Sequence, residues 1–238
     1  MMHIKRLLFV FAFFTCFFIS EVVIAQNVNQ FDENKQRTGV WEKKYSNNKI
    51  RYSGAFEDGK EIGVFKFYNN SSSQYPVIIK TYSKKNDSVL VQFFTTKGQL
   101  QSKGYFFNKS RIGHWSYYFK DGKKMSDEFY NEGKLEGELI NYYPNGKVTE
   151  VSLYKNGLKY GVSKKYSSEG ILIEEVTFKK GELNGVAKYF ELNGNLKETG
   201  SYLLGIRIGK WEYYLDGEVT SDEDLKKKKA TFIKKKEN

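Results

Sequence analysis

The sequence predicts an all-β fold, an elongated β-meander of consecutive β-hairpins with about eight repeats of 24 residues. Glycine recurs at a fixed step of 24 residues, at Gly113, Gly137, Gly161, Gly185 and Gly209. Turn-forming glycines and β-prone aromatic residues keep the same step between these frame glycines. Self-similarity at one period is typical of a repeat architecture, in which each unit is one small supersecondary structure.

The clearest unit spans residues 113–136 and contains two short aromatic-rich runs. Trp115–Phe119 is followed by a turn at Gly122, and Lys123–Tyr130 is followed by a turn at Gly133. Asp-Gly and Asn-Gly between β-prone runs are strong hairpin signals, because glycine adopts the positive φ that tight turns require. The unit therefore predicts two strands of about six residues and two tight turns.

Aromatic residues keep one register in the other units. A single equivalent position carries Tyr68, Phe94, Tyr118, Tyr142, Tyr166, Phe190 and Tyr214. Two glycines in every unit would repeatedly break a helix, and the apolar residues do not recur every 3.6 positions. Strands paired side by side at about 4.8 Å would arrange about sixteen strands into a sheet roughly 75 Å long.

The period fails at one place. Gly63 and Val89 are 26 residues apart, and Val89 stands where a frame glycine is expected. The two additional residues fall in Asn69–Pro76, which predicts a polar loop in place of a glycine turn, followed by a strand at Val77–Tyr82. Such a loop either binds a ligand or is a tolerated insertion.

Residues 1–25 are predicted to be a signal peptide, because Lys5 and Arg6 precede the apolar run Leu7–Ile19. This run is shorter than the about 20 residues that a membrane-spanning helix needs. An uncleaved anchor is the alternative. We expect an exported bacterial protein, in the periplasm, at the cell surface or secreted, with no transmembrane helix after cleavage.

The rest of the chain is expected to have three parts. Residues 26–38 are polar and aperiodic, which predicts a flexible N-terminal lead-in. Residues 39–219 form the repeat array. Residues 220–238 form a Lys-rich C-terminal tail, whose dense like charge favours disorder, with capping of the last strand as the alternative.

The chain has few residues for catalysis or metal binding. Cys16 is the only cysteine, and it would leave with the signal peptide together with His3. A Cys–His nucleophile and a Cys/His zinc site are thereby excluded, and a Ser-His-Asp triad could rest only on His114. We expect no catalytic residue, no metal and no cofactor, and we expect His114 to be an exposed neutral residue.

The net charge of +11 is concentrated at the end of the chain. Residues 226–238 hold seven lysines against Glu237 and contribute +6, whereas residues 26–225 contribute +4. The basic balance therefore belongs to a tail and not to a binding face. With export, it argues against a nucleic-acid partner.

Two segments, residues 105–122 and 202–217, resemble the variant MORN repeat through Gly-His-Trp-Ser-Tyr-Tyr and Gly-Lys-Trp-Glu-Tyr-Tyr followed by a turn glycine. The similarity covers residues 39–219. It implies a β-hairpin array that contacts proteins or lipid and no reaction, and bacterial proteins of this kind are often labelled YwqK-type antitoxins. Tryptophan at its usual position is replaced by Leu139, Ser163 and Ala187.

Choline-binding and glucan-binding cell-wall repeats share the Gly-x-Trp-x-Tyr-Tyr pattern. Their unit is shorter, near twenty residues, and their tryptophans are denser. The 24-residue step therefore favours the variant MORN repeat.

The candidate contact residues are aromatic, because ring faces stack on sugars and attract cations. They are Trp41, Trp115, Trp211, Tyr118, Tyr142, Tyr166 and Tyr214. A structural role competes with binding, because a one-layer sheet must cover its faces with large side chains.

Three functions remain open at this point. The first is a non-catalytic exported scaffold that binds a protein, glycan or membrane surface through many weak, equivalent contacts. The second is a cell-envelope module that recognises polysaccharide or choline-like groups in tryptophan pockets. The third is a hydrolase that uses paired carboxylates.

Overall fold

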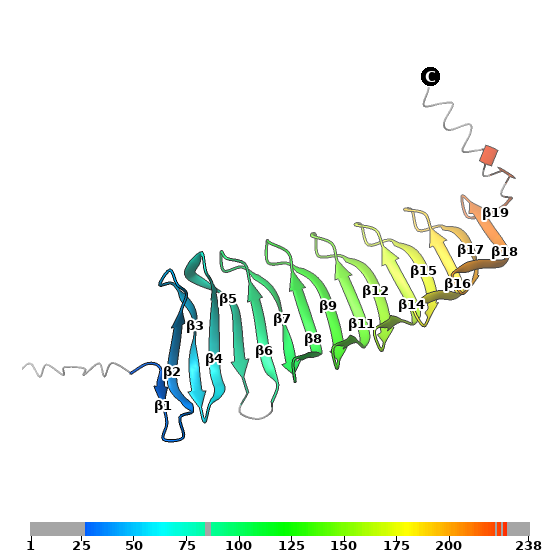
Figure 1. Cartoon of the computed structure of the whole chain (residues 1–238). Helices are drawn as coiled ribbons and strands as arrows, with labels where there is room; N and C mark the ends of the chain where they lie inside the picture. The colour runs from blue at the N-terminus through cyan, green and yellow to red at the C-terminus, as the bar shows by residue number, and fades with distance from the viewer. Residues whose placement is uncertain (1–26, 84–86, 222, 225, 228–238) are drawn as a thin grey trace, which may run out of the picture.

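Nineteen strands form one elongated, twisted sheet in the computed structural model (Figure 1). The structure describes residues 27–83, 87–221, 223–224 and 226–227. The predicted signal peptide and most of the predicted C-terminal tail lie outside these residues. The first strands are β1 (Gln30–Phe31), β2 (Arg37–Lys44), β3 (Ile50–Glu57), β4 (Lys60–Asn69), β5 (Ser72–Tyr82), β6 (Val89–Phe94), β7 (Leu100–Phe107), β8 (Ser110–Tyr118) and β9 (Lys124–Asn131). The others are β10 (Lys134–Leu135), β11 (Gly137–Tyr142), β12 (Val148–Lys155), β13 (Leu158–Lys159), β14 (Gly161–Tyr166), β15 (Leu172–Lys179), β16 (Glu182–Phe190), β17 (Leu196–Leu203), β18 (Ile206–Leu215) and β19 (Glu218–Thr220).

Each strand pairs antiparallel with the strands next to it in sequence. β2 pairs with β3, β3 with β4, and the pattern continues to β18 with β19. β10 and β11 both pair with β9, and β13 and β14 both pair with β12. Each of these two pairs is therefore one strand of the sheet that is interrupted in the middle. This arrangement confirms the predicted all-β meander of consecutive hairpins.

One long edge of the sheet is made of two-residue turns. Both residues of each turn have positive φ, as in Glu132-Gly133 (47° and 81°) and Asn156-Gly157 (51° and 82°). Positive φ at both positions defines the type I′ turn, whose twist matches that of paired strands. Each turn glycine also donates its N–H to the preceding hairpin, for example Gly157 to the carbonyl of Leu135 at 2.8 Å. Backbone hydrogen bonds therefore join successive hairpins along this edge.

The other long edge is made of wider turns, which side chains link to one another. The N–H of Gly122 donates to the carbonyl of Phe119 at 3.0 Å, and Gly122 has a φ of 84°. The hydroxyl of Tyr143 donates to the carbonyl of Tyr166 at 2.9 Å, and Tyr45 makes the same bond to Tyr68 at 2.8 Å. Hydrogen bonds between neighbouring repeats therefore stabilise both long edges of the sheet.

The frame glycines mark bulges in the sheet. Lys103 pairs with Ser116 and Tyr105 pairs with Ile112, so residues 113–115 of β8 stand against the single residue Gly104 of β7. Gly113 has a φ of 59°, a conformation that residues with a Cβ rarely adopt. A bulge bends and twists its strand, and the same irregularity recurs at Gly63, Gly185 and Gly209.

Val89 changes the local structure because it replaces a frame glycine. β5 and β6 pair without a register shift from Ile78–Phe93 to Tyr82–Val89. A β-branched residue does not adopt the left-handed conformation of the frame position, so this hairpin has no bulge.

Two expectations about the N-terminal half are corrected. The polar segment Asn69–Pro76 is not a loop, because β4 extends to Asn69 and β5 begins at Ser72. The two additional residues lengthen this hairpin, and the pairing slips between Phe67 and Asn69. The predicted lead-in also contains the short strand β1, which pairs with β2, so the sheet starts before residue 39.

The core lies on one side of the sheet, which we call the ring face. The residues two positions after each frame position project from it, namely Trp41, Phe65, Val91, Trp115, Leu139, Ser163, Ala187 and Trp211. Phe65, Trp115 and Ala187 are completely buried. The opposite face carries Val64, His114, Val162 and Val186, and its side chains are more exposed.

Candidate functional site

Trp115 is the centre of an aromatic cluster on the ring face. Its ring lies 5.1 Å from Phe106 and 6.3 Å from Tyr130, both edge-to-face, and 6.4 Å from Phe93 and Tyr117. Its Nε1 donates to the carbonyl of Tyr105 at 3.2 Å. With an exposed fraction of 0 %, Trp115 has no surface for a partner. Burial therefore removes it from the predicted contact residues, whereas Trp41 and Trp211 are half-buried.

An arginine four residues earlier accompanies every tryptophan. The guanidinium carbon lies over the indole at 4.9 Å for Arg37 and Trp41, 4.6 Å for Arg111 and Trp115, and 3.8 Å for Arg207 and Trp211. Guanidinium groups stack favourably on aromatic rings. The tryptophans are thus covered by the protein's own cations, and the predicted open tryptophan pockets for choline-like groups are not seen among the described residues.

The middle units replace this arrangement with smaller side chains. Ser163 lies against Ser152, and their hydroxyl oxygens are 2.6 Å apart in the interior of the ring face. Ser152 also donates to Glu150 at 2.7 Å, and Lys159 forms an ion pair with the same carboxylate. Burial raises the pKa of Glu150, but the hydrogen bonds from Lys159 and Ser152 outweigh it and lower the pKa overall. In these units, a hydrogen bond between two serine hydroxyls occupies the place that an aromatic ring has in the other units.

The predicted tyrosine column lies near the wide-turn edge. Tyr118, Tyr142, Tyr166 and Tyr214 are all half-buried. The hydroxyl of Tyr142 donates to Asp127 at 3.2 Å, and that of Tyr214 donates to Glu212 at 3.1 Å. The column is therefore partly committed to hydrogen bonds within the protein.

Asp127 is the most heavily bonded carboxylate of the opposite face and is only 8 % exposed. Its partners are Lys124 Nζ at 2.7 Å, His114 Nε2 at 2.8 Å, Ser116 Oγ at 2.9 Å and Tyr142. Burial raises the pKa of Asp127, but the hydrogen bonds from Lys124, Ser116 and His114 together lower it below its ordinary value. The hydrogen bonds of this cluster therefore satisfy the buried carboxylate of Asp127 and fix its position.

This cluster brings Ser116, His114 and Asp127 together, but not in the order of a hydrolytic triad. Serine and histidine both bond to the same oxygen of Asp127. In a triad the histidine stands between serine and carboxylate, so that it can remove the serine proton. Ser116 is also only 3 % exposed, which closes it to a substrate. His114 is exposed as expected, although it lies within β8 and bonds to Asp127.

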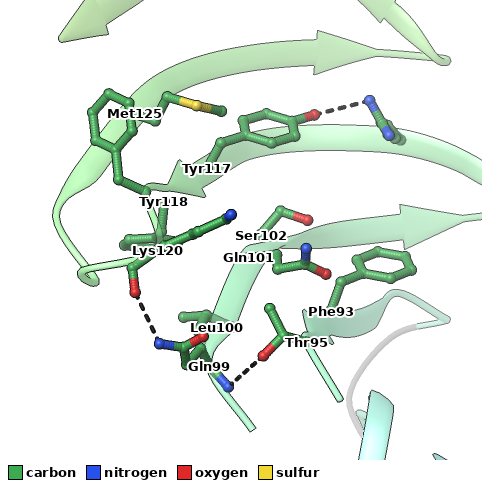
Figure 2. A pocket seen from close by; sticks show the side chains of 12 residues that line it. Phe93, Thr95, Gln99, Leu100, Gln101, Ser102, Tyr117, Tyr118, Lys120 and Met125 are labelled. Atoms are coloured by element: carbon green, nitrogen blue, oxygen red, sulfur yellow. Dashed lines mark hydrogen bonds between the residues drawn. The ribbon is translucent and has the colours of Figure 1, made fainter. Parts of the chain in front are cut away.

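A polar hollow opens on the ring face beside the wide turns, with a volume of about 460 Å³. Phe93, Tyr117 and Met125 contribute its apolar surface, and Gln101 lies beside them (Figure 2). The hydroxyl of Tyr117 accepts a hydrogen bond from Arg111 at 2.9 Å. Burial and the neighbouring Tyr130 raise the pKa of Tyr117 well above its ordinary value, so its hydroxyl stays neutral.

A second hollow, of about 390 Å³, lies where the ring column is interrupted. We call it the valine hollow, because Val89 and Val91 lie between the rings of Tyr82 on one side and Phe106 on the other. Without a bulge at Val89, Val91 pairs directly with Lys80 and does not cover it. The interruption of the repeat thus leaves a gap between two ring clusters.

The opposite face carries a stripe of exposed apolar side chains, which we call the apolar stripe. It consists of Val64, Tyr105, Phe129, Tyr160, Val162, Val186 and Ile208, each between 41 and 52 % exposed. Strand pairing places them on one face, because cross-strand partners share a side of the sheet. The stripe runs from β4 to β18.

The glycines beneath the rings were not recognised in the sequence as functional positions. Gly54, Gly104 and Gly200 lie 11 residues before Phe65, Trp115 and Trp211, and the ring of each covers the glycine. Their signal was available, because they fall outside the turn positions and precede an aromatic residue by a constant step. The apolar stripe was also missed, because its members are scattered over both halves of the repeat.

Within the described part of the chain, no helix is long and apolar enough to cross a membrane. Nor do the described residues contain a group of three or more His, Cys, Asp or Glu side chains arranged to hold a metal ion.

Three consecutive repeats match the family model of the MORN repeat variant, at residues 135–156, 159–180 and 183–203. MORN repeats are non-enzymatic modules that generally bind proteins or membranes. No curated protein matches the chain. The crystal structure of TarM is similar over 43 % of this chain and 20 % of its own chain, at 17 % identity and a TM-score of 0.30.

Proposed function

We propose that this protein is a non-catalytic scaffold that binds a protein partner along the apolar stripe. The observation that carries the proposal is the exposure of seven large apolar side chains on one face of the array. Exposed apolar side chains that gather on one face are typical of interaction sites. Its repetition across hairpins provides many weak contacts whose effects combine through effective concentration.

The match to MORN repeats supports the same function, because these modules generally bind proteins or membranes. The triad-like cluster, in which the serine is inaccessible, favours a binding role over catalysis. A membrane surface and a glycan are the alternative partners, and the test must distinguish them from a protein.

The test compares capture by the mature chain with capture by the double variant Val162→Ser/Val186→Ser. Each protein is immobilised, incubated with a cell-envelope extract, and its retained proteins are identified by mass spectrometry. Leu192→Ser is the matched control, because Leu192 is 69 % exposed in a turn outside the stripe.

A partner retained by the wild type and by Leu192→Ser, but lost by the double variant, supports the proposal. Equal retention by all three proteins contradicts it. If phosphatidylglycerol vesicles or purified glycan bind to the wild type and to Leu192→Ser but not to the double variant, the partner of the stripe is that surface and not a protein.

A second candidate function is polysaccharide binding in the polar hollow of Figure 2. Rings beside amide and hydroxyl groups suit sugars, which stack on ring faces and accept or donate hydrogen bonds. Saturation-transfer NMR with envelope glycan fragments tests this candidate. A signal that Tyr117→Ala abolishes supports it, and the absence of any signal excludes it for the fragments used.

We also propose that the chain is exported, on the strength of Lys5, Arg6 and the apolar run 7–19. Export would place the array in the periplasm, at the cell surface or outside a bacterial cell. Cell fractionation with N-terminal sequencing tests this proposal. A mature chain that begins at Gln26 in the envelope or medium supports it, and an uncleaved cytoplasmic chain contradicts it.

A further inference from the structure

We infer that the valine hollow binds a carboxylate carried on an aromatic or branched apolar body. This site is separate from the apolar stripe, because the hollow lies on the ring face and the stripe lies on the opposite face. Its volume of about 390 Å³ falls at the lower end of the range for small-molecule sites.

The walls of the hollow are apolar and largely aromatic. Tyr82, Phe93 and Phe106 line it with their rings, and Val89 and Val91 lie between them. Phe106 and Phe93 are held in place by Trp115, at centroid distances of 5.1 and 6.4 Å. The rings are therefore fixed before a ligand arrives, which reduces the entropy cost of binding.

Two lysines give the apolar hollow a positive charge. Lys80 and Lys109 both line it, and among the described residues neither forms an ion pair with a carboxylate. Lys80 lies over the ring of Phe67 at 5.0 Å. At the equivalent position three other hairpins have Gly54, Gly104 and Gly200, and a lysine stands there only at Lys80.

Lys109 is held in an unfavourable conformation. It is the second residue of a type I′ turn with a φ of 67°, where other such turns have Gly59, Gly133, Gly157, Gly181 and Gly205. A residue with a Cβ is disfavoured in this region, because its Cβ lies too close to the following carbonyl oxygen. Strained residues persist mainly where the side chain has a function, which here is to present an ammonium group to the hollow.

The two features together specify the ligand. Two ammonium groups select an anion, and a carboxylate is compact enough to lie between or beside them. The rings and valines select an apolar body of about the size of a phenyl or branched alkyl group. A free small acid and the C-terminal residue of a polypeptide both carry this chemistry.

The test is isothermal titration calorimetry of the mature chain with 3-phenylpropionate and with 3-phenylpropionamide. The acid is expected to bind at least about tenfold more tightly than the uncharged amide, because hydrogen bonds to charged groups are stronger than hydrogen bonds between neutral groups. The peptide Ala-Ala-Phe, with a free or an amidated C-terminus, is titrated in parallel.

The variants Lys109→Gly and Lys80→Met should each raise the Kd of the acid about tenfold or more. Lys109→Gly also restores the usual turn residue, so its thermal midpoint should stay equal or rise, which separates loss of binding from loss of fold. Lys180→Gly is the matched control, because it removes a lysine from another type I′ turn outside the hollow.

Tighter binding of the free peptide than of 3-phenylpropionate identifies a polypeptide C-terminus, and the reverse identifies a small acid. Both results support the inference. Equal binding of acid and amide, unchanged affinity in both lysine variants, or no binding of any carboxylate would overturn it.

Discussion

The indole ring of Trp115 lies directly against the α-carbon of Gly104. A Cβ at Gly104 would come within 2.2 Å of the ring, which no side chain tolerates. The bulge at Gly113 is the cause, because it sets residues 113–115 against this single glycine. The same relationship joins Gly200 to Trp211 and Gly54 to Phe65.

We expect Gly104→Ala to destabilise the protein by about 1–3 kcal/mol, because the added methyl overpacks a site without free space. Trp115→Leu alone should also destabilise it, through the loss of buried ring contacts. The double variant should lose less than the sum of the two, because the smaller side chain makes room for the methyl. Urea unfolding of the four proteins measures this coupling. Additive losses would show that Gly104 does not support the ring.

We expect Gly113→Val to destabilise the array by about 1–3 kcal/mol, because valine strains the backbone at a φ of 59°. Gly113→Asn is the matched control and should lose less, because asparagine tolerates the left-handed region. Thermal unfolding of both variants checks the order. If valine and asparagine were equally harmful, conformational strain would not explain why Val89 lacks a bulge.

Asp127 should make part of the stability depend on acid pH. Its folded pKa is lowered, so the carboxylate contributes stability above the ordinary aspartate pKa of about 4, and this is lost as the pH falls through the lowered value. Asp127→Asn should therefore lose stability at pH 7 and show a weaker dependence below pH 4. Urea midpoints from pH 2 to 7 measure this. Glu138→Gln, an exposed carboxyl on the same face, should keep the wild-type profile; identical profiles for both variants would contradict the assignment.

The serine pair should behave as one unit. Ser152→Ala is expected to cost about 1 kcal/mol, because Glu150 and Ser163 both lose a buried partner. Ser152→Ala/Ser163→Ala should cost no more than the single variant, since it leaves no unpaired hydroxyl. Chemical unfolding of the single and double variants gives the comparison. A double variant that loses twice as much would show that the two hydroxyls contribute independently.

Local sequence signals predicted the repeat because its turns are set by backbone conformation. Pairs such as Asn156-Gly157 specify a type I′ turn directly, and the constant step then places every strand. The bulges at Gly63, Gly113, Gly185 and Gly209 follow from the same property of glycine. The meander was therefore predictable from single residues and their spacing.

The candidate site was less predictable because it depends on contacts between strands. In the sequence, Trp115 looked available for a partner. In the structure, Phe93, Phe106 and Tyr130 from three other strands bury it. Tyr117 and Arg111 of its own strand complete the cover. The strand at Ser72 was missed because its polar residues have no β pattern of their own and follow the pairing of β4.

The equivalence of the frame glycines has a genetic consequence. Residues 113–209 repeat without slippage, and the hairpins described there form their backbone hydrogen bonds with neighbouring hairpins, so removal of residues 137–160 would join Glu136 to Gly161 in the same register. In-frame duplication or loss of 72 base pairs would therefore change the length of the array without inventing a new interface. The length of the sheet can therefore change in evolution by whole repeats. The valine hollow would keep its place, because its lining residues precede residue 113.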